Sequence, residues 1–119
     1  MVDSAMMLFG EAGLTQVRTV SLFPEDSPEV FDVKLTAAIN EVDTGDGAIV
    51  LADLLGGTPC NRAAYKAVEG VQVIPGMNLP LFLELLGLRM GGDVDINNLI
   101  SVARDGIVSL NSLLLGGKN

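Results

Sequence analysis

The 119-residue chain contains no histidine and no tryptophan, and it has a single cysteine, Cys60. Without histidine, neither a Ser-His-Asp nor a Cys-His mechanism has its base. A metal site would have only one thiol and no imidazole to use. One cysteine cannot form an internal disulfide, which fits a reducing compartment. We therefore expect neither a bound metal nor another cofactor.

Basic residues are also scarce. Seven Lys and Arg stand against 15 Asp and Glu, for a net charge of −8, and they are scattered from Arg18 to Lys118. A nucleic-acid binder needs clustered positive charge, so that class is excluded, and the acidity suits a basic partner. No apolar stretch approaches the roughly 20 residues of a membrane span, and Met1–Ser4 lacks the basic region of a signal peptide. The expected location is the cytoplasm.

Aromatic residues make up only 4% of the chain, although 49% of it is hydrophobic, so the core must be aliphatic. The length predicts one domain over residues 1–119. Three apolar stretches are expected to be strands: Val17–Phe23, which alternates as an edge strand does; Ala48–Ala52, continuously apolar as a central parallel strand is; and Val71–Ile74. Each is followed by a helix-start signal. This repeat predicts an α/β three-layer sandwich with a mainly parallel sheet flanked by helices.

Four helices are expected after possible capping residues. They run from Pro28 to about Val42 after Ser27, from Pro59 to about Glu69 after Thr58, from Leu79 to Leu88 after Asn78, and from Ile96 to about Leu115 after Asp95. In the first, Val30, Leu35, Ala38, Ile39 and Val42 form the expected buried stripe. The Leu-rich third helix has two interpretations, burial in the monomer or a subunit interface.

The front of the chain has the pattern of a helix, Val2–Phe9, which stops at Gly10. A helix that opens an α/β domain normally follows a strand. We therefore expect that the first strand, of about 5–6 residues, and its loop, of about 4–6 residues, are not in this chain. In that case the domain is incomplete at its N-terminus.

Polar and glycine residues gather where the predicted strands end. Parallel strands place their carboxyl ends at one edge, where ligands bind. That edge collects Asp53, Gly56, Gly57 and Thr58 from one turn and Asn78 from the next. Backbone N–H groups at helix starts suit phosphate, and glycines let an oxyanion approach them. The sequence therefore predicts a phosphate site here, supported by Asp53 and Thr58.

Simpler interpretations stay open for each of these residues. Gly56-Gly57 is common as a plain turn, Thr58 can be only a helix cap, and Asp53 can cap a neighbouring helix. Cys60, in the first turn of a helix, is best explained as a small packing residue. The glycine turn at Gly56-Gly57 is neither a P-loop nor a dinucleotide fingerprint, because no Lys follows the glycines and the G-x-G-x-x-G spacing is absent.

The chain resembles a known family at two segments, Gly47–Asn61 and Val73–Pro80, and more weakly at Phe9–Glu11 and Ser21–Pro28. It looks like the mannose-family enzyme IIA domain of the bacterial sugar phosphotransferase system. The resemblance implies a cytoplasmic homodimer. It also implies a histidine that takes a phosphoryl group from the carrier protein HPr and passes it to the IIB component.

By the same resemblance, Asp53 matches the acid beside the active histidine, Thr58 the hydroxyl residue near the phosphate, and Gly56 and Gly57 the turn glycines. The family's histidine follows the first strand, which lies inside the sheet between the segments that match Val17–Leu22 and Ala48–Ala52. We expect this chain to lack that strand, and it contains no histidine. Three functions therefore remain: a phosphoryl carrier in its complete form, a non-catalytic regulatory or interaction module on the same fold, or the related carrier that serves dihydroxyacetone kinase.

Overall fold

The computed structural model describes residues 15–45, 47–92 and 94–116. These residues belong to two compact units, one that ends at Met77 and one that begins at Asn78. The helix expected at Val2–Phe9 lies outside the described residues.

The N-terminal unit is built on a strand–helix–strand motif. Strands β1 (Ile49–Leu51) and β2 (Gln72–Ile74) pair in parallel, with Val50 opposite Val73, and α3 (Thr58–Ala67) connects them. A connection of this length is what two parallel neighbours require. The predicted α/β class and parallel pairing are confirmed.

Helices α2 (Pro28–Val42) and α3 cover the same face of this sheet. Phe31 and Leu35 of α2 and Ala63 of α3 are buried together. Partly buried residues pack against them from the strands, from α2 and from the preceding segment: Val20, Leu22, Ile39, Val50 and Val73. The predicted stripe of α2 is wrong at Val30, which is 45% exposed, because Phe31, at 2%, faces the core instead.

The prediction of a strand at Val17–Phe23 is wrong. The segment is irregular, and the sheet in the described part of the chain has two strands. A strand needs a neighbour to supply its hydrogen bonds, and no described segment pairs with this one. Within the described residues, β1 pairs only with β2 and is half-buried, so it is not the doubly covered central strand expected at Ala48–Ala52.

The C-terminal unit contains α4 (Leu79–Met90), α5 (Ile96–Asp105) and the short α6 (Leu110–Leu114). Helices α4 and α5 pack against each other. Leu81, Phe82 and Leu86 of α4 are buried in the isolated chain, so burial in the monomer is confirmed for this face of the Leu-rich helix. Among the described helices, none is both long and apolar enough to cross a membrane.

A single helix from Ile96 to Leu115 does not form. Helix α5 ends at Gly106, and α6 begins anew after Ser109, whose hydroxyl accepts from the Ser112 N–H at 3.2 Å. A Cβ atom at position 106 would lie 2.5 Å from Cγ of Pro80. This close approach between α4 and the end of α5 requires glycine, which also has a low helix propensity.

Candidate functional site

The loop between β1 and α3 is a turn fixed by its own hydrogen bonds. The Gly57 N–H donates to the Leu54 carbonyl at 3.4 Å, and the Asn61 side-chain amide donates to the Gly56 carbonyl at 3.1 Å. Gly56 has φ = +87°, a conformation that residues with a Cβ rarely adopt. The turn therefore needs the first glycine for its backbone geometry.

Helix α3 begins one residue earlier than predicted. Gly57, not Thr58, is the N-cap, and Thr58 is the first helical residue, followed by Pro59. Thr58 therefore makes no cap, and Gly57 has no side chain to make one. The N–H groups of Thr58 and Cys60 lie in the first turn, where an α-helix offers its amides no carbonyl acceptor.

Among the described helices, α3 is the one that begins without a side-chain cap. Side-chain oxygens close the starts of the others: Ser27 for α2, Asn78 for α4, Asp95 for α5 and Ser109 for α6. The first turn of α3 also lacks an acidic residue, whereas α2 has Glu29 there. The positive end of the α3 dipole is thus left open to an anion.

The loop after β2 meets the loop after β1. The Met77 N–H donates to the Ala52 carbonyl at 3.0 Å, which brings the end of Pro75–Met77 beside the residue that precedes Asp53. Asp53, Gly56 and Thr58 are all exposed. The carboxylate and the open helix start thus share one accessible loop, and the binding of phosphate there stays a prediction.

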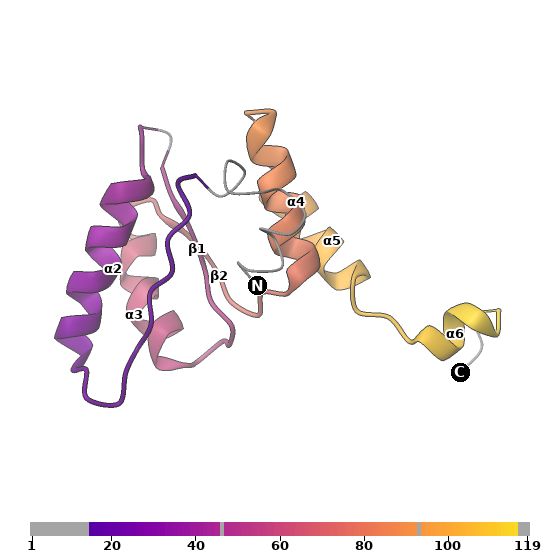
Figure 1. Ribbon diagram of the computed structural model, residues 1–119, viewed down its shortest axis with the longest axis horizontal. Coiled ribbons are helices and arrows are strands. Elements are labelled where there is room, and N and C mark those ends of the chain that lie inside the picture. Colours follow the sequence, from indigo (N-terminus) through magenta and orange to yellow (C-terminus); the bar gives the residue numbers. More distant parts are fainter. Residues whose placement is uncertain (1–14, 46, 93, 117–119) are drawn as a thin grey trace. The chain divides into compact units, whose positions relative to one another are not determined.

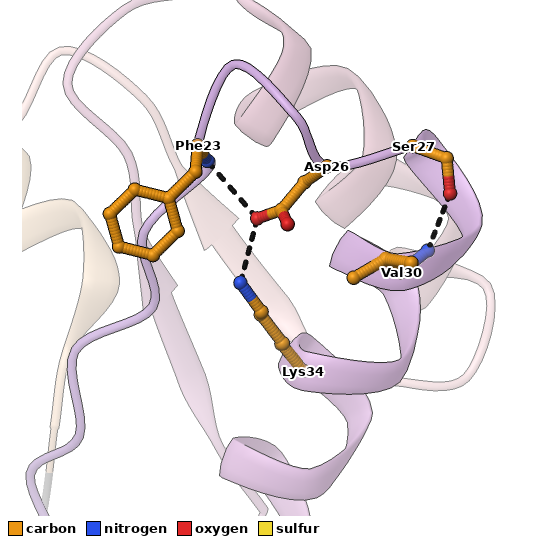
Figure 2. Close-up of polar contacts among 5 residues, drawn as sticks. All are labelled: Phe23, Asp26, Ser27, Val30 and Lys34. Atoms are coloured by element: carbon orange, nitrogen blue, oxygen red, sulfur yellow. Dashed lines mark hydrogen bonds and ion pairs between the residues drawn. The ribbon is translucent and has the colours of Figure 1, made fainter.

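A third turn, Pro24–Ser27, lies at the same end of this unit (Figure 1). Figure 2 shows how Asp26 holds it: Oδ2 accepts from the Phe23 N–H at 3.1 Å and from Lys34 Nζ at 2.7 Å. Lys34 also lies 4.8 Å from the centre of the Phe23 ring. The hydrogen bond from Lys34, followed by that from Phe23, lowers the pKa of Asp26. The carboxylate is thus used to fix the turn.

Asn78, also predicted to bind phosphate, belongs to the C-terminal unit. Its Oδ1 accepts from the Leu81 N–H at 3.0 Å, and its Nδ2 donates to the Ala103 carbonyl at 2.8 Å. Both ends of the amide therefore have partners that stabilise α4 and α5. Its role toward phosphate stays a prediction.

The sequence interpretation missed Asn61, which holds the Gly56 carbonyl. Its position, five residues after the first glycine of the pair, was the available signal. Cys60 is buried, so its interpretation as a packing residue is confirmed. The described residues include no group of three or more His, Cys, Asp or Glu that could hold a metal ion.

Comparison with known proteins shows the family of this chain. A family model described as the PTS system fructose IIA component, EIIA-man, matches residues 1–100. The chain belongs to this family. The Escherichia coli K12 "PTS system mannose-specific EIIAB component" is 31% identical over 116 residues, which is 92% of this chain and 35% of that protein.

A "PTS system fructose-specific EIIA component" from Bacillus subtilis is 32% identical over 89 residues, covering 73% of this chain and 60% of that one. The fold is similar to that of a solved PTS IIA protein associated with the fucose utilization operon of Streptococcus pneumoniae. Its TM-score is 0.82 at 26% identity, over 95% of this chain and 85% of that one. The chain thus spans about a third of the mannose relative and three fifths of the fructose relative.

Proposed function

We propose that this chain acts as the IIA component of a bacterial sugar phosphotransferase system, at the step where a phosphoryl group passes from HPr to IIB. Family membership supports the system. One observation supports the location of the site: the start of α3 has no side-chain cap and lies on the same exposed loop as Asp53. We place the protein in the cytoplasm as a homodimer, as the family resemblance implies.

In this proposal each residue of the loop has a distinct role. The N–H groups of Thr58 and Cys60 and the Thr58 hydroxyl donate to phosphoryl oxygens, which the α3 dipole stabilises. Gly56 and Gly57 keep side chains away from the approaching group. Asp53 accepts from the N–H of the imidazole that carries the phosphoryl group and so orients it. That imidazole is not among these 119 residues, which contain no histidine.

Incubation with phosphorylated HPr tests the proposal. We expect the 119-residue chain to bind HPr without gaining acid-labile label, and the amide NMR signals of Gly57, Thr58 and Cys60 to shift on binding. The variant Asp53→Asn removes the carboxylate of the proposed site. Asp105→Asn, at an exposed position in the other unit, removes the same charge and serves as its control. Binding that leaves the 53–60 signals unmoved would refute the site, and acid-labile label on this chain would refute the role of an external histidine.

The absence of histidine favours one second candidate, a non-catalytic module that binds HPr or IIB without transferring phosphate. The genomic sequence upstream of Met1 discriminates the two. An in-frame strand pattern followed by a histidine supports the carrier, and a stop codon directly before Met1 supports the module.

A carrier that serves dihydroxyacetone kinase has less support. The Gly-Gly-Thr-Pro-x-Asn turn of residues 56–61 is the form expected for the sugar system, and the named relatives are mannose, fructose and sorbose components. A neighbouring gene for a kinase instead of a membrane sugar permease would favour this alternative.

A further inference from the structure

Asn61 binds the carbonyl groups of both glycines in the loop before α3. Its backbone N–H donates to the Gly57 carbonyl at 2.9 Å, and its side-chain Nδ2 donates to the Gly56 carbonyl at 3.1 Å. The first of these bonds is the ordinary bond to the fourth residue before, with which a helix begins, and any residue except proline makes it. The second needs a short side chain that carries an N–H donor, which asparagine supplies.

The two carbonyls belong to successive peptide planes, and each plane also carries an N–H group. The plane that contains the Gly56 carbonyl carries the Gly57 N–H, which donates to the Leu54 carbonyl at 3.4 Å. The plane that contains the Gly57 carbonyl carries the Thr58 N–H, a phosphate donor in the proposed site. Rotation of the first plane changes φ of Gly57, the N-cap residue, and with it the angle at which the second plane enters the helix.

The glycine pair gives the loop no rigidity of its own. Neither glycine has a Cβ, so rotation of the peptide between them meets little steric resistance. Gly56 has φ = +87°, and Gly57 precedes the first helical residue, so neither is held by the helix interior. Within the described residues, this peptide plane is held by the bond from the Asn61 side chain and by the longer bond to Leu54. The Asn61 side chain is therefore the main restraint on its orientation.

We infer that Asn61 is a positioning residue: its side-chain amide fixes the peptide between Gly56 and Gly57, and through it the direction of the Thr58 N–H toward a phosphoryl oxygen. The inference rests on the proposed function, because it names what holds the donors of that site in place. A donor that is fixed before binding loses less freedom when the anion arrives. When only a fraction of the molecules hold the competent loop conformation, the apparent affinity falls by that fraction.

Titration of the 119-residue chain with inorganic phosphate, followed by the amide NMR signals of Gly57, Thr58 and Cys60, tests this role. Sodium chloride at equal ionic strength corrects for general effects of salt. Asn61→Ala should weaken the phosphate Kd on the order of fivefold, the factor that corresponds to one lost hydrogen bond. The same variant should add exchange broadening, on the microsecond-to-millisecond scale, to the Gly57 and Thr58 signals.

Two controls separate positioning from stability. Asn40→Ala makes the same chemical change at an exposed site of α2 and should leave the phosphate Kd within about twofold. Ser27→Ala removes the cap of α2 and destabilises the same unit without touching the loop, so its Kd should also stay within about twofold. Asn61→Ala should remain folded, because its side chain is exposed and alanine is the better helix former. Urea midpoints check each variant.

The outcomes separate this inference from the proposed function. If phosphate shifts the wild-type signals and Asn61→Ala binds it with the same Kd, the positioning role is overturned while the proposed function stands. The same holds if Ser27→Ala weakens the Kd as much as Asn61→Ala does, because lost stability then explains the effect. If phosphate moves none of the three wild-type signals, there is no anion to position for, and the inference is overturned. The proposed function is decided separately, by the binding of HPr in the absence of free phosphate.

Discussion

Alanine at position 106 tests the packing between α4 and the end of α5. The backbone of Gly106 has φ = −75°, which any residue adopts, so its conformation does not demand glycine. Space does, because an added Cβ would lie 2.5 Å from Cγ and 2.8 Å from Cβ of Pro80. A proline ring cannot swing aside as a long flexible side chain can. We expect Gly106→Ala to cost about 1–3 kcal/mol of unfolding free energy, the usual range for an overpacked site.

The same chemical change at Gly87 provides the matched control. Gly87 lies inside α4, is exposed, and would have nothing within 4 Å of an added Cβ. Alanine there should stabilise the protein by about 0.8–1 kcal/mol through helix propensity. The two variants should therefore differ by about 2–4 kcal/mol, or about 8–16 °C in Tm at about 4 °C per kcal/mol.

Urea unfolding followed by far-ultraviolet circular dichroism measures both variants, since the chain has one tyrosine and no tryptophan to report by fluorescence. Pro80→Ala in the Gly106→Ala background should recover part of the loss, because it removes the nearest atom. If Gly106→Ala unfolds at the same urea concentration as the wild type, or if both glycine variants shift in the same direction, the packing argument fails.

Three further predictions concern the N-terminal unit. Ser27→Ala should lower the unfolding free energy by about 1 kcal/mol through loss of the α2 cap, and Ser27→Gly by only a few tenths, in the same urea assay. Asp26→Asn should be less stable than wild type at neutral pH. Lys34 lowers the pKa of Asp26 in the folded state. The difference in unfolding free energy between wild type and variant should therefore disappear as the pH falls below about 4, the pKa range of an unfolded aspartate. A free-energy difference that stays constant down to pH about 2 would contradict this expectation. Arg62 and Asp32 form an ion pair that joins α3 to α2. A double-mutant cycle of Arg62→Met and Asp32→Asn should give a coupling energy of about 0.2–1 kcal/mol. This coupling energy should shrink in high salt, and a coupling energy unchanged by salt would point to another cause.

Local signals in the sequence located most helix starts. Ser27, Asn78 and Asp95 are the N-caps of α2, α4 and α5, as predicted, because a short polar side chain before a helix bonds the amides two or three residues on. Thr58 failed as a predicted cap because the same local pattern, a hydroxyl residue before proline, also fits the first position of a helix. The neighbouring Gly57 took the cap position instead.

Features that depend on distant residues could not be predicted this way. Val17–Phe23 alternates like a strand, but whether it forms one depends on a neighbour elsewhere in the chain. The apolar pattern continues past Gly106, and the contact with Pro80 that leaves no room for a side chain there comes from another helix. In the candidate site, Asp53 and the two glycines followed from the order of residues, whereas the hydrogen bonds that Leu54 and Asn61 make within the turn required coordinates.

The segment that follows α5 has a practical consequence. Six large aliphatic side chains within residues 107–115 are 59–77% exposed in the described chain. An exposed apolar surface makes a protein easier to precipitate with salts such as sulfate. These salts are excluded from the protein surface and so strengthen the association of apolar side chains. Ammonium sulfate should therefore precipitate this protein at a lower concentration than a variant in which Leu113 and Leu114 are serine, and purification at low ionic strength should retain more of it.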